Sequence, residues 1–192
     1  MSYAIYKTEA IIIRITPNGE ASLDVTFFTR DLGKIIARVQ SARKHESKMR
    51  MHLIRYNHVV IYLVRGKNVW RLTGIHGMRK LDVFQNEEFL RAWYRTTSLA
   101  EHLIRGEEPH PEIFDFLVQL SETPSFRGGD TRSVTGALEL FGVIHVLDML
   151  GYWHGEKLPL IPTEEILVTC LGNKKELVKM INESIEATQI VV

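Results

Sequence analysis

The stretch SLDVTFFTRDLGKIIARVQS, residues 22–41, decides the fold of the first half of the chain. Apolar and polar residues alternate on both sides of the turn signal Asp31-Leu32-Gly33, which predicts two β-strands, over 22–29 and 34–41. The side chains expected on their inward faces are Leu23, Val25, Phe27, Ile35, Ala37 and Val39. Two strands with one apolar face each need further strands to cover that face, so the pattern favours a small sheet or barrel.

Three more strand patterns lie on either side of this stretch. The runs are 10–16, 58–65 and 69–76, the last two joined across Gly66-Lys67-Asn68 as in a β-hairpin. Strict alternation over the first run predicts one continuous strand face that holds Ile11, Ile13 and Ile15. Five short strands separated by turn signals predict a small β-barrel within residues 1–80.

Apolar residues recur with a helical period from Asn86 onward. The predicted helices begin at Asn86 and after Pro111, and three more cover 131–150, 163–171 and 174–187. The helix over 131–150 is apolar nearly all round, which predicts the centre of a bundle, and the Gly- and Pro-containing stretch 121–130 predicts a loop. We therefore predict an α+β chain of two domains, a five-stranded barrel over 1–80 and an all-α helical bundle domain over 81–192.

Charge is divided between the two predicted domains. The net charge of the chain is only +1, but residues 1–80 hold 15 Lys and Arg against 5 Asp and Glu, a net charge of +10. Residues 81–192 hold the other 9 basic residues against 18 acidic ones, a net charge of −9. A surface of +10 attracts polyanions through counterion release, which predicts nucleic-acid binding by the first domain. The alternatives are mutual attraction of the two domains or charges spread over solvated surfaces.

Basic residues of the first domain fall into three clusters, over residues 34–38, 43–50 and 65–71. Lys34 and Arg38 lie on one face of a predicted strand, about 13 Å apart, and can follow one phosphate backbone. Trp70, beside the third cluster, alternates in phase with Leu72, so we expect it in the core. Tyr56 and Tyr62 stay open as side chains that could stack on bases. The candidate nucleic-acid contacts are Lys34, Arg38, Arg43, Lys44, Lys48, Arg50, Arg65, Lys67 and Arg71.

Motifs for catalysis or metal binding are missing from the sequence. It contains no P-loop, no Gly-x-Ser-x-Gly and no Gly-x-Gly-x-x-Gly. Cys170 is the single cysteine, which excludes an internal disulfide and a multi-cysteine zinc site. His145 lies in an apolar helix, where we expect a hydrogen-bonded core residue. We predict no catalytic residue, no metal and no cofactor. Charges interrupt every stretch long enough to span a membrane, which favours a cytoplasmic protein without a membrane partner.

An ordered series of segments runs through both halves of the chain. In the first half it comprises Glu9-Ala10-Ile11-Ile12, Pro17-x-Gly19-Glu20-x-Ser22, Phe27-Phe28-Thr29-Arg30-Asp31-x-Gly33-Lys34, Ala42-Arg43-Lys44, Ser47-Lys48-x-Arg50, and Leu63-x-Arg65-Gly66 with Trp70-Arg71-Leu72. In the second half it comprises Ala137-Leu138-Glu139-Leu140-Phe141 and Leu147-x-Met149-Leu150-Gly151-Tyr152. Over about residues 5–160, the series resembles the RecO family of bacterial DNA repair and recombination mediators.

The resemblance implies an N-terminal OB-fold followed by a helical domain. It also implies the activities of the RecFOR pathway in the bacterial cytoplasm, at the nucleoid. These are binding to single- and double-stranded DNA, annealing of complementary strands, and loading of RecA, together with RecR, onto strands coated by single-stranded DNA-binding protein. Annealing changes no covalent bond, so it needs no catalytic residue. The residues leave open the alternative of an OB-fold protein-interaction module without annealing activity and, with much less support, that of a small hydrolase.

The family's functional positions carry over residue by residue. Its Gly-Lys pair and the basic position downstream fall on Lys34 and Arg38, and its Ala-Arg-Lys segment on Arg43 and Lys44. Many relatives hold zinc through four cysteines after the Leu-Gly-Tyr segment and extend some tens of residues further. Here Trp153-His154-Gly155-Glu156 follows, so we expect a short form without zinc. The cations expected to hold the acidic tail of single-stranded DNA-binding protein are Arg127, Arg132 and Lys157.

Overall fold

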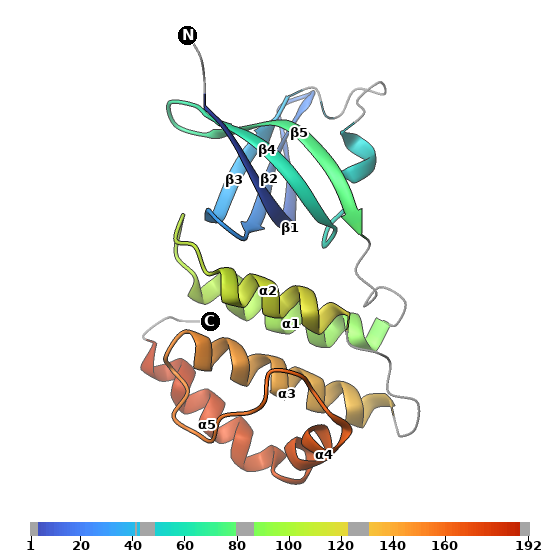
Figure 1. Ribbon diagram of the computed structural model, residues 1–192, viewed down its shortest axis with the longest axis vertical. Coiled ribbons are helices and arrows are strands. Elements are labelled where there is room, and N and C mark those ends of the chain that lie inside the picture. The colour runs from blue at the N-terminus through green and yellow to red at the C-terminus, as the bar shows by residue number, and fades with distance from the viewer. Residues whose placement is uncertain (1–3, 41, 43–48, 80–86, 123–130, 189–192) are drawn as a thin grey trace. The chain divides into compact units, whose positions relative to one another are not determined.

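The computed structural model describes residues 4–40, 42, 49–79, 87–122 and 131–188. The strands within these ranges are β1 (Ile5–Asn18), β2 (Ser22–Thr29), β3 (Gly33–Val39), β4 (His58–Arg65) and β5 (Trp70–Arg79) (Figure 1). The helices are the 3-10 helix η1 (Arg50–His52), α1 (Glu87–Leu103), α2 (Pro111–Ser121), α3 (Thr131–Met149), α4 (Glu164–Gly172) and α5 (Lys174–Ala187). A barrel followed by helices is therefore confirmed. The predicted loop over 121–130 falls largely outside the described residues.

The five strands close into a barrel in the order β1-β2-β3-β5-β4. β1 pairs on both sides, with β4 through residues 5–11 and with β2 through residues 10–18, antiparallel in each case. A short parallel pairing of β3 with β5 closes the last gap, with Ala37 opposite Trp70 and Arg38 opposite Arg71. This pairing brings the outer face of β3 beside the β4–β5 hairpin, where the candidate site lies.

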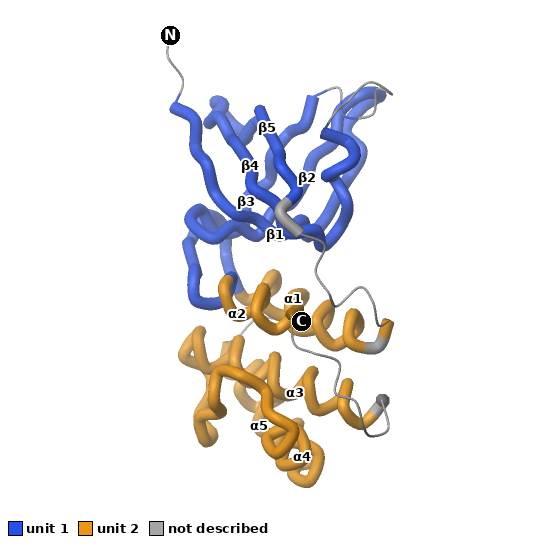
Figure 2. The backbone as a smooth tube through the Cα atoms, turned by 45° about the vertical axis from the view of Figure 1, so that its right-hand side comes forward, with its two compact units in different colours: residues 1–81, 104–114 blue, residues 82–103, 115–192 orange. Residues whose placement is uncertain are grey.

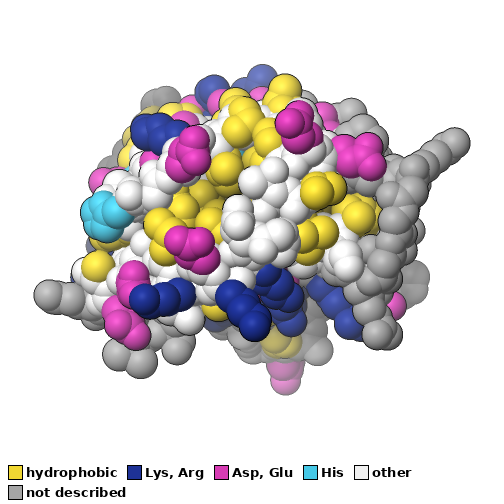
Figure 3. Space-filling model, turned by 90° about the horizontal axis from the view of Figure 1, so that it is seen from below, with side chains coloured by type: hydrophobic (Ala, Val, Ile, Leu, Met, Phe, Trp, Pro, Cys, Tyr) yellow, Lys and Arg dark blue, Asp and Glu magenta, His cyan; other side chains and the backbone are white. Residues whose placement is uncertain are grey.

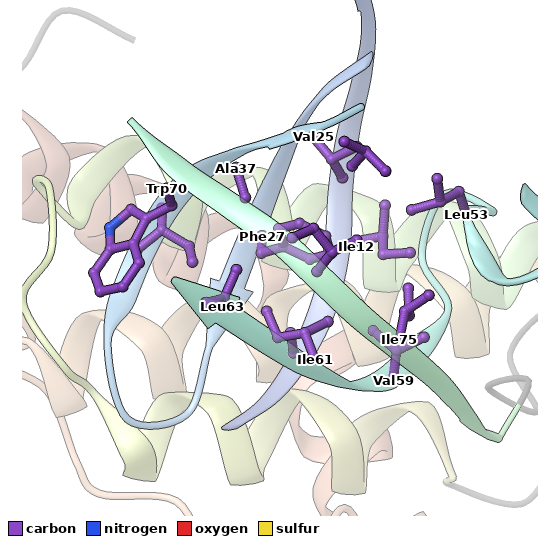
Figure 4. Packing of buried hydrophobic residues seen from close by; sticks show 14 of the residues in the cluster. Ile12, Val25, Phe27, Ala37, Leu53, Val59, Ile61, Leu63, Trp70 and Ile75 are labelled. Atoms are coloured by element: carbon purple, nitrogen blue, oxygen red, sulfur yellow. The ribbon is translucent and has the colours of Figure 1, made fainter. Parts of the chain in front are cut away.

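Alternate side chains of the strands fill the interior of the barrel (Figure 4). The inward faces predicted for β2 and β3 are confirmed, and Trp70, at 5% exposed, belongs to this core as expected. The prediction of one continuous apolar face on β1 is wrong. A register shift between Ile12 and Arg14 changes the inward face, so Ile12 and Ile15 both pack in the core.

The compact unit that contains the barrel includes a second stretch of chain. Unit 1 consists of residues 1–81 and 104–114, and unit 2 of residues 82–103 and 115–192 (Figure 2). Within unit 1 the amide of Lys34 donates to the carbonyl oxygen of Gly106 over 3.0 Å. Phe114 lies with its ring centroid 6.0 Å from that of Phe28. The segment 104–114 therefore belongs with the barrel, although α1 separates it from β5 in sequence.

Glycine is needed where this segment meets the start of β3. Gly33 has a φ of +70°, and a Cβ at this position would overlap the backbone of Glu108. The absence of a side chain therefore serves two purposes at Gly33, because it permits the left-handed conformation of the β2–β3 turn and the close approach of the segment 104–114.

The second unit is built around α3, which packs against α1, α4 and α5. The central position predicted for this apolar helix is confirmed. His145 is a core residue, as expected, with its Nδ1 atom 2.9 Å from the carbonyl oxygen of Phe141 and its ring stacked on Phe116 at 4.9 Å. Burial lowers the pKa of the His145 imidazole, although hydrogen bonding to the Phe141 carbonyl opposes that shift.

Candidate nucleic-acid interface

A groove runs over the outer face of the barrel between β3 and the loop that joins β4 to β5. Its volume is about 570 Å³. Four cations line it, Lys34 and Arg38 from β3 and Arg65 and Lys67 from the end of β4 and the loop. Apolar side chains also line the groove, among them Val69 and Ile36, the latter 55% exposed.

A second hollow adjoins the first and shares Arg38, Arg65 and Lys67 with it. It adds Arg71 from β5 and has a volume of about 850 Å³. The two hollows together are called the basic groove below. The basic groove thus unites five of the nine candidate contacts, which come from two of the three clusters in the sequence: Lys34, Arg38, Arg65, Lys67 and Arg71.

Strand geometry places these cations. Outward positions on β3 alternate with the core residues Ile35 and Ala37, so Lys34 and Arg38 point away from the core. The loop after Arg65 is tight, because the Gly66 amide donates to the Val69 carbonyl oxygen over 3.0 Å. A Cβ on Gly66 would lie 2.6 Å from that oxygen, so glycine is needed for the turn that presents Lys67.

Asp24 on β2 holds the guanidinium of Arg38. Arg38 Nε lies 3.0 Å from one carboxylate oxygen of Asp24 and Nη2 lies 3.3 Å from the other. The hydrogen bond from Arg38 lowers the pKa of the Asp24 carboxyl, and Asn18 adds a second bond of 2.5 Å. The bidentate contact fixes the Arg38 guanidinium, which stays 40% exposed.

Glu107, from the segment 104–114, holds Arg65 and Trp70 together. Its carboxylate accepts a hydrogen bond from Arg65 Nη1 and another from Trp70 Nε1, the latter at 3.0 Å. The Arg65 guanidinium also lies over the Trp70 ring, 4.6 Å from its centroid. Burial alone would raise the pKa of the Glu107 carboxyl, but the hydrogen bonds from Arg65 and Trp70 outweigh it and the net pKa is lowered.

The aromatic residues differ in their access to solvent. Tyr56 is buried, and Tyr62 on β4 packs edge-on against His76 with the ring centroids 5.6 Å apart. Sequence reasoning missed Tyr6, which is 41% exposed. The rings of Tyr6 and Trp70 pack in a T-shaped arrangement with their centroids 5.2 Å apart. Tyr6 lines a hollow that also includes Arg65. The alternation predicted for β1 began at residue 10, so no signal drew attention to Tyr6.

The other candidate residues of the first unit lie elsewhere or outside the described residues. Arg50 is exposed in η1 and is not among the side chains that line the basic groove. Arg43, Lys44 and Lys48 fall outside the described residues. These four contacts therefore stay predictions.

The cations predicted to hold an acidic tail belong to the second unit. The side chains of Arg127 and Arg132 are not among those described. Lys157 is 83% exposed, with Nζ 3.8 Å from a carboxylate oxygen of Asp148. Figure 3 shows basic and acidic side chains mixed around exposed apolar ones, and the exposed apolar residues of this unit include Leu160, Ile161 and Val168. The acidic-tail site likewise stays a prediction.

The described ranges contain neither a metal-binding cluster nor a membrane-spanning helix. The described side chains of His, Cys, Asp and Glu form no group of three that could hold a metal ion. Cys170 is buried, and burial raises the pKa of its thiol. In the part of the chain that the structure describes, no helix is long and apolar enough to cross a membrane.

Strand order and groove together define an OB-fold barrel. OB-folds bind oligonucleotides on the face of strands 2 and 3 and with the loops after strands 1 and 4, and the basic groove uses β3 and the loop after β4. Residues 1–79 match the family described as "Recombination protein O N terminal". The chain belongs to the RecO family.

Individual relatives extend the match into the second unit. "DNA repair protein RecO" of Dehalococcoides mccartyi is 30% identical over 148 residues, which cover 77% of this chain and 56% of the relative. The protein of the same name from Roseiflexus sp. is 31% identical over 150 residues, 77% of this chain and 50% of the relative. The chain therefore spans about half the length of the curated relatives it matches.

Proposed function

We propose that this chain is a DNA-binding mediator of repair and recombination that holds single-stranded and double-stranded DNA in the basic groove. The observation that carries the proposal is the convergence of cations from β3, β5 and the β4–β5 loop on one surface of an OB-fold. Cations in a groove follow a phosphate backbone without reading its sequence. The names of the relatives, each a DNA repair protein, support a repair role.

An apolar side chain between the cations offers a contact for unpaired bases. Ile36 is flanked on β3 by Lys34 and Arg38, and its apolar side chain is 55% exposed in the groove. A strand whose phosphates contact these two cations would lay sugars and bases over Ile36. Duplex DNA hides its base faces, so this contact favours single strands.

Annealing follows from the same features. Two complementary strands repel each other until cations neutralise their phosphates, and they must also be held loosely enough to exchange partners. A groove of cations around a small apolar floor meets both requirements, because it offers charge without base-specific hydrogen bonds. We propose further that the chain works with RecR to help load RecA onto strands coated by single-stranded DNA-binding protein, as its family membership suggests.

A binding titration tests the proposed site. Lys34→Glu with Arg38→Glu is expected to weaken binding of a labelled oligothymidylate and of a duplex alike, measured by fluorescence anisotropy over a series of salt concentrations. The slope of log K against log salt should fall by roughly 0.7 to 0.9 per lost phosphate contact. Unchanged affinity would rule out this site.

A strand-annealing assay tests the proposed activity. Two labelled complementary oligonucleotides should pair faster with the protein than without it, and the double variant should lose the acceleration. If the protein binds DNA without accelerating pairing, the alternative of a protein-interaction module is favoured.

A further inference from the structure

We propose that Glu107 is an internal competitor for DNA phosphates in the basic groove and so limits the affinity for DNA. The inference rests on the proposed function, since it concerns the regulation of the same site. A carboxylate is planar and a phosphate is tetrahedral, but both carry anionic oxygens that accept hydrogen bonds from arginine. Glu107 therefore occupies one of the donors that a DNA phosphate would use.

Among the described acidic residues of unit 1, Glu107 is the one that lines the basic groove. Its carboxylate lines the groove together with Lys34, Arg38 and Lys67, and it binds Arg65 directly. Asp24 also pairs with a groove arginine, Arg38, but is not among the residues that line either hollow. Negative charge inside the groove opposes a polyanion more strongly than charge behind it, because the Coulomb interaction falls with distance.

The backbone holds this charge in place. The carbonyl oxygen of Gly106, the preceding residue, accepts the amide of Lys34 over 3.0 Å. Trp70, a core residue, donates its Nε1 hydrogen to the carboxylate over 3.0 Å. A DNA phosphate that binds Arg65 must therefore displace the Glu107 carboxylate, which the hydrogen bond from Trp70 keeps near the groove. The repulsion between the phosphate and this carboxylate then persists in the complex. Weaker binding and faster release follow, which suits a protein that must let strands exchange.

Neutral variants of Glu107 test the inference. Glu107→Gln keeps an oxygen that can accept from Trp70 Nε1 and removes the charge, and Glu107→Ser removes charge and length together. The matched control is Glu20→Gln, which makes the same change of charge at an exposed residue after β1 that does not line the groove. Unfolding curves of all variants establish that each is folded.

Binding of a labelled oligothymidylate is measured by fluorescence anisotropy, and release by stopped-flow dilution. We expect both Glu107 variants to bind about fivefold more tightly than the wild type, with slower release, and Glu20→Gln to change affinity less. Equal effects at Glu107 and Glu20, or weaker binding by the Glu107 variants, would overturn the inference while the proposed function stands. If the wild type fails to bind at low salt, the proposed function itself is overturned, and the inference with it.

Discussion

Arg38 and Arg71 are register partners across the parallel pairing of β3 and β5 that closes the barrel. Like charges directly opposite each other on neighbouring strands destabilise a sheet. The pair by itself is therefore unfavourable for folding, which is consistent with the proposed binding of a polyanion, and Asp24 already offsets part of the charge on Arg38.

Removal of both charges should weaken DNA binding. We expect Arg38→Gln with Arg71→Gln to lower the salt slope for single-stranded DNA by roughly 0.7 per lost contact, measured by anisotropy. The control is Arg91→Gln on α1, an exposed arginine that pairs with Glu87. A loss of affinity as large in the control would point to net charge, rather than the groove, as the cause.

Ile36 should matter more for single strands than for duplex. Ile36→Thr keeps a β-branched side chain on β3 and removes apolar surface, so we expect a loss of about threefold to fivefold in affinity for oligothymidylate and little change for duplex. Ile5→Thr is the matched control, because Ile5 is 65% exposed on β1 and is not among the side chains that line the groove. Equal losses for both DNA forms would argue against a contact between Ile36 and bases.

Gly33 should tolerate alanine far less well than Gly19. Both glycines have a positive φ, +70° and +66°, so alanine costs about 1 kcal/mol at either position from backbone strain alone. At Gly33 the new Cβ would also overlap the Glu108 backbone, whereas at Gly19 nothing lies within 4 Å. Denaturant unfolding of Gly33→Ala should therefore show a further loss of about 1 to 3 kcal/mol. Similar losses for the two variants would contradict the described packing of the segment 104–114.

Acid should destabilise the second unit through His145. Its imidazole has a lowered pKa in the folded state, so between the unfolded pKa of 6.5 and the lower folded value only the unfolded chain takes up the proton. Stability is therefore complete above pH 6.5 and declines as pH falls through this window. His145→Gln, which does not titrate, should show a weaker dependence in thermal unfolding followed by helical circular dichroism. Parallel pH profiles for the two proteins would exclude this role.

Local patterns predicted most of the secondary structure. Period-two alternation located β2 and β4 at their observed ends, and the helical period located α5 over 174–187, because in each case one face is buried and the other is not. The early start of β1 was missed, since β1 gains residues 5–9 by pairing with β4, a partner distant in sequence. The shift between Ile12 and Arg14 left no local signal either.

Cations of the site were predictable, but their carboxylate partners were not. Lys34 and Arg38 stood out because they share one face of a strand, whereas their meeting with Arg65 depends on the β3–β5 pairing. Glu107 lies between Gly106 and Pro109, in a stretch that resembles an ordinary connection between helices. Its contact with Trp70 comes from tertiary packing that periodicity does not encode.

The division of unit 1 into two stretches has a consequence for synthesis on the ribosome. Residues 1–81 emerge first, and residues 104–114 follow only after the whole of α1 has been translated. During that interval Phe28 lacks the Phe114 ring that packs against it in the finished protein. The nascent barrel therefore matures in two stages, because its strands can close before the segment 104–114 adds Glu107 to the groove.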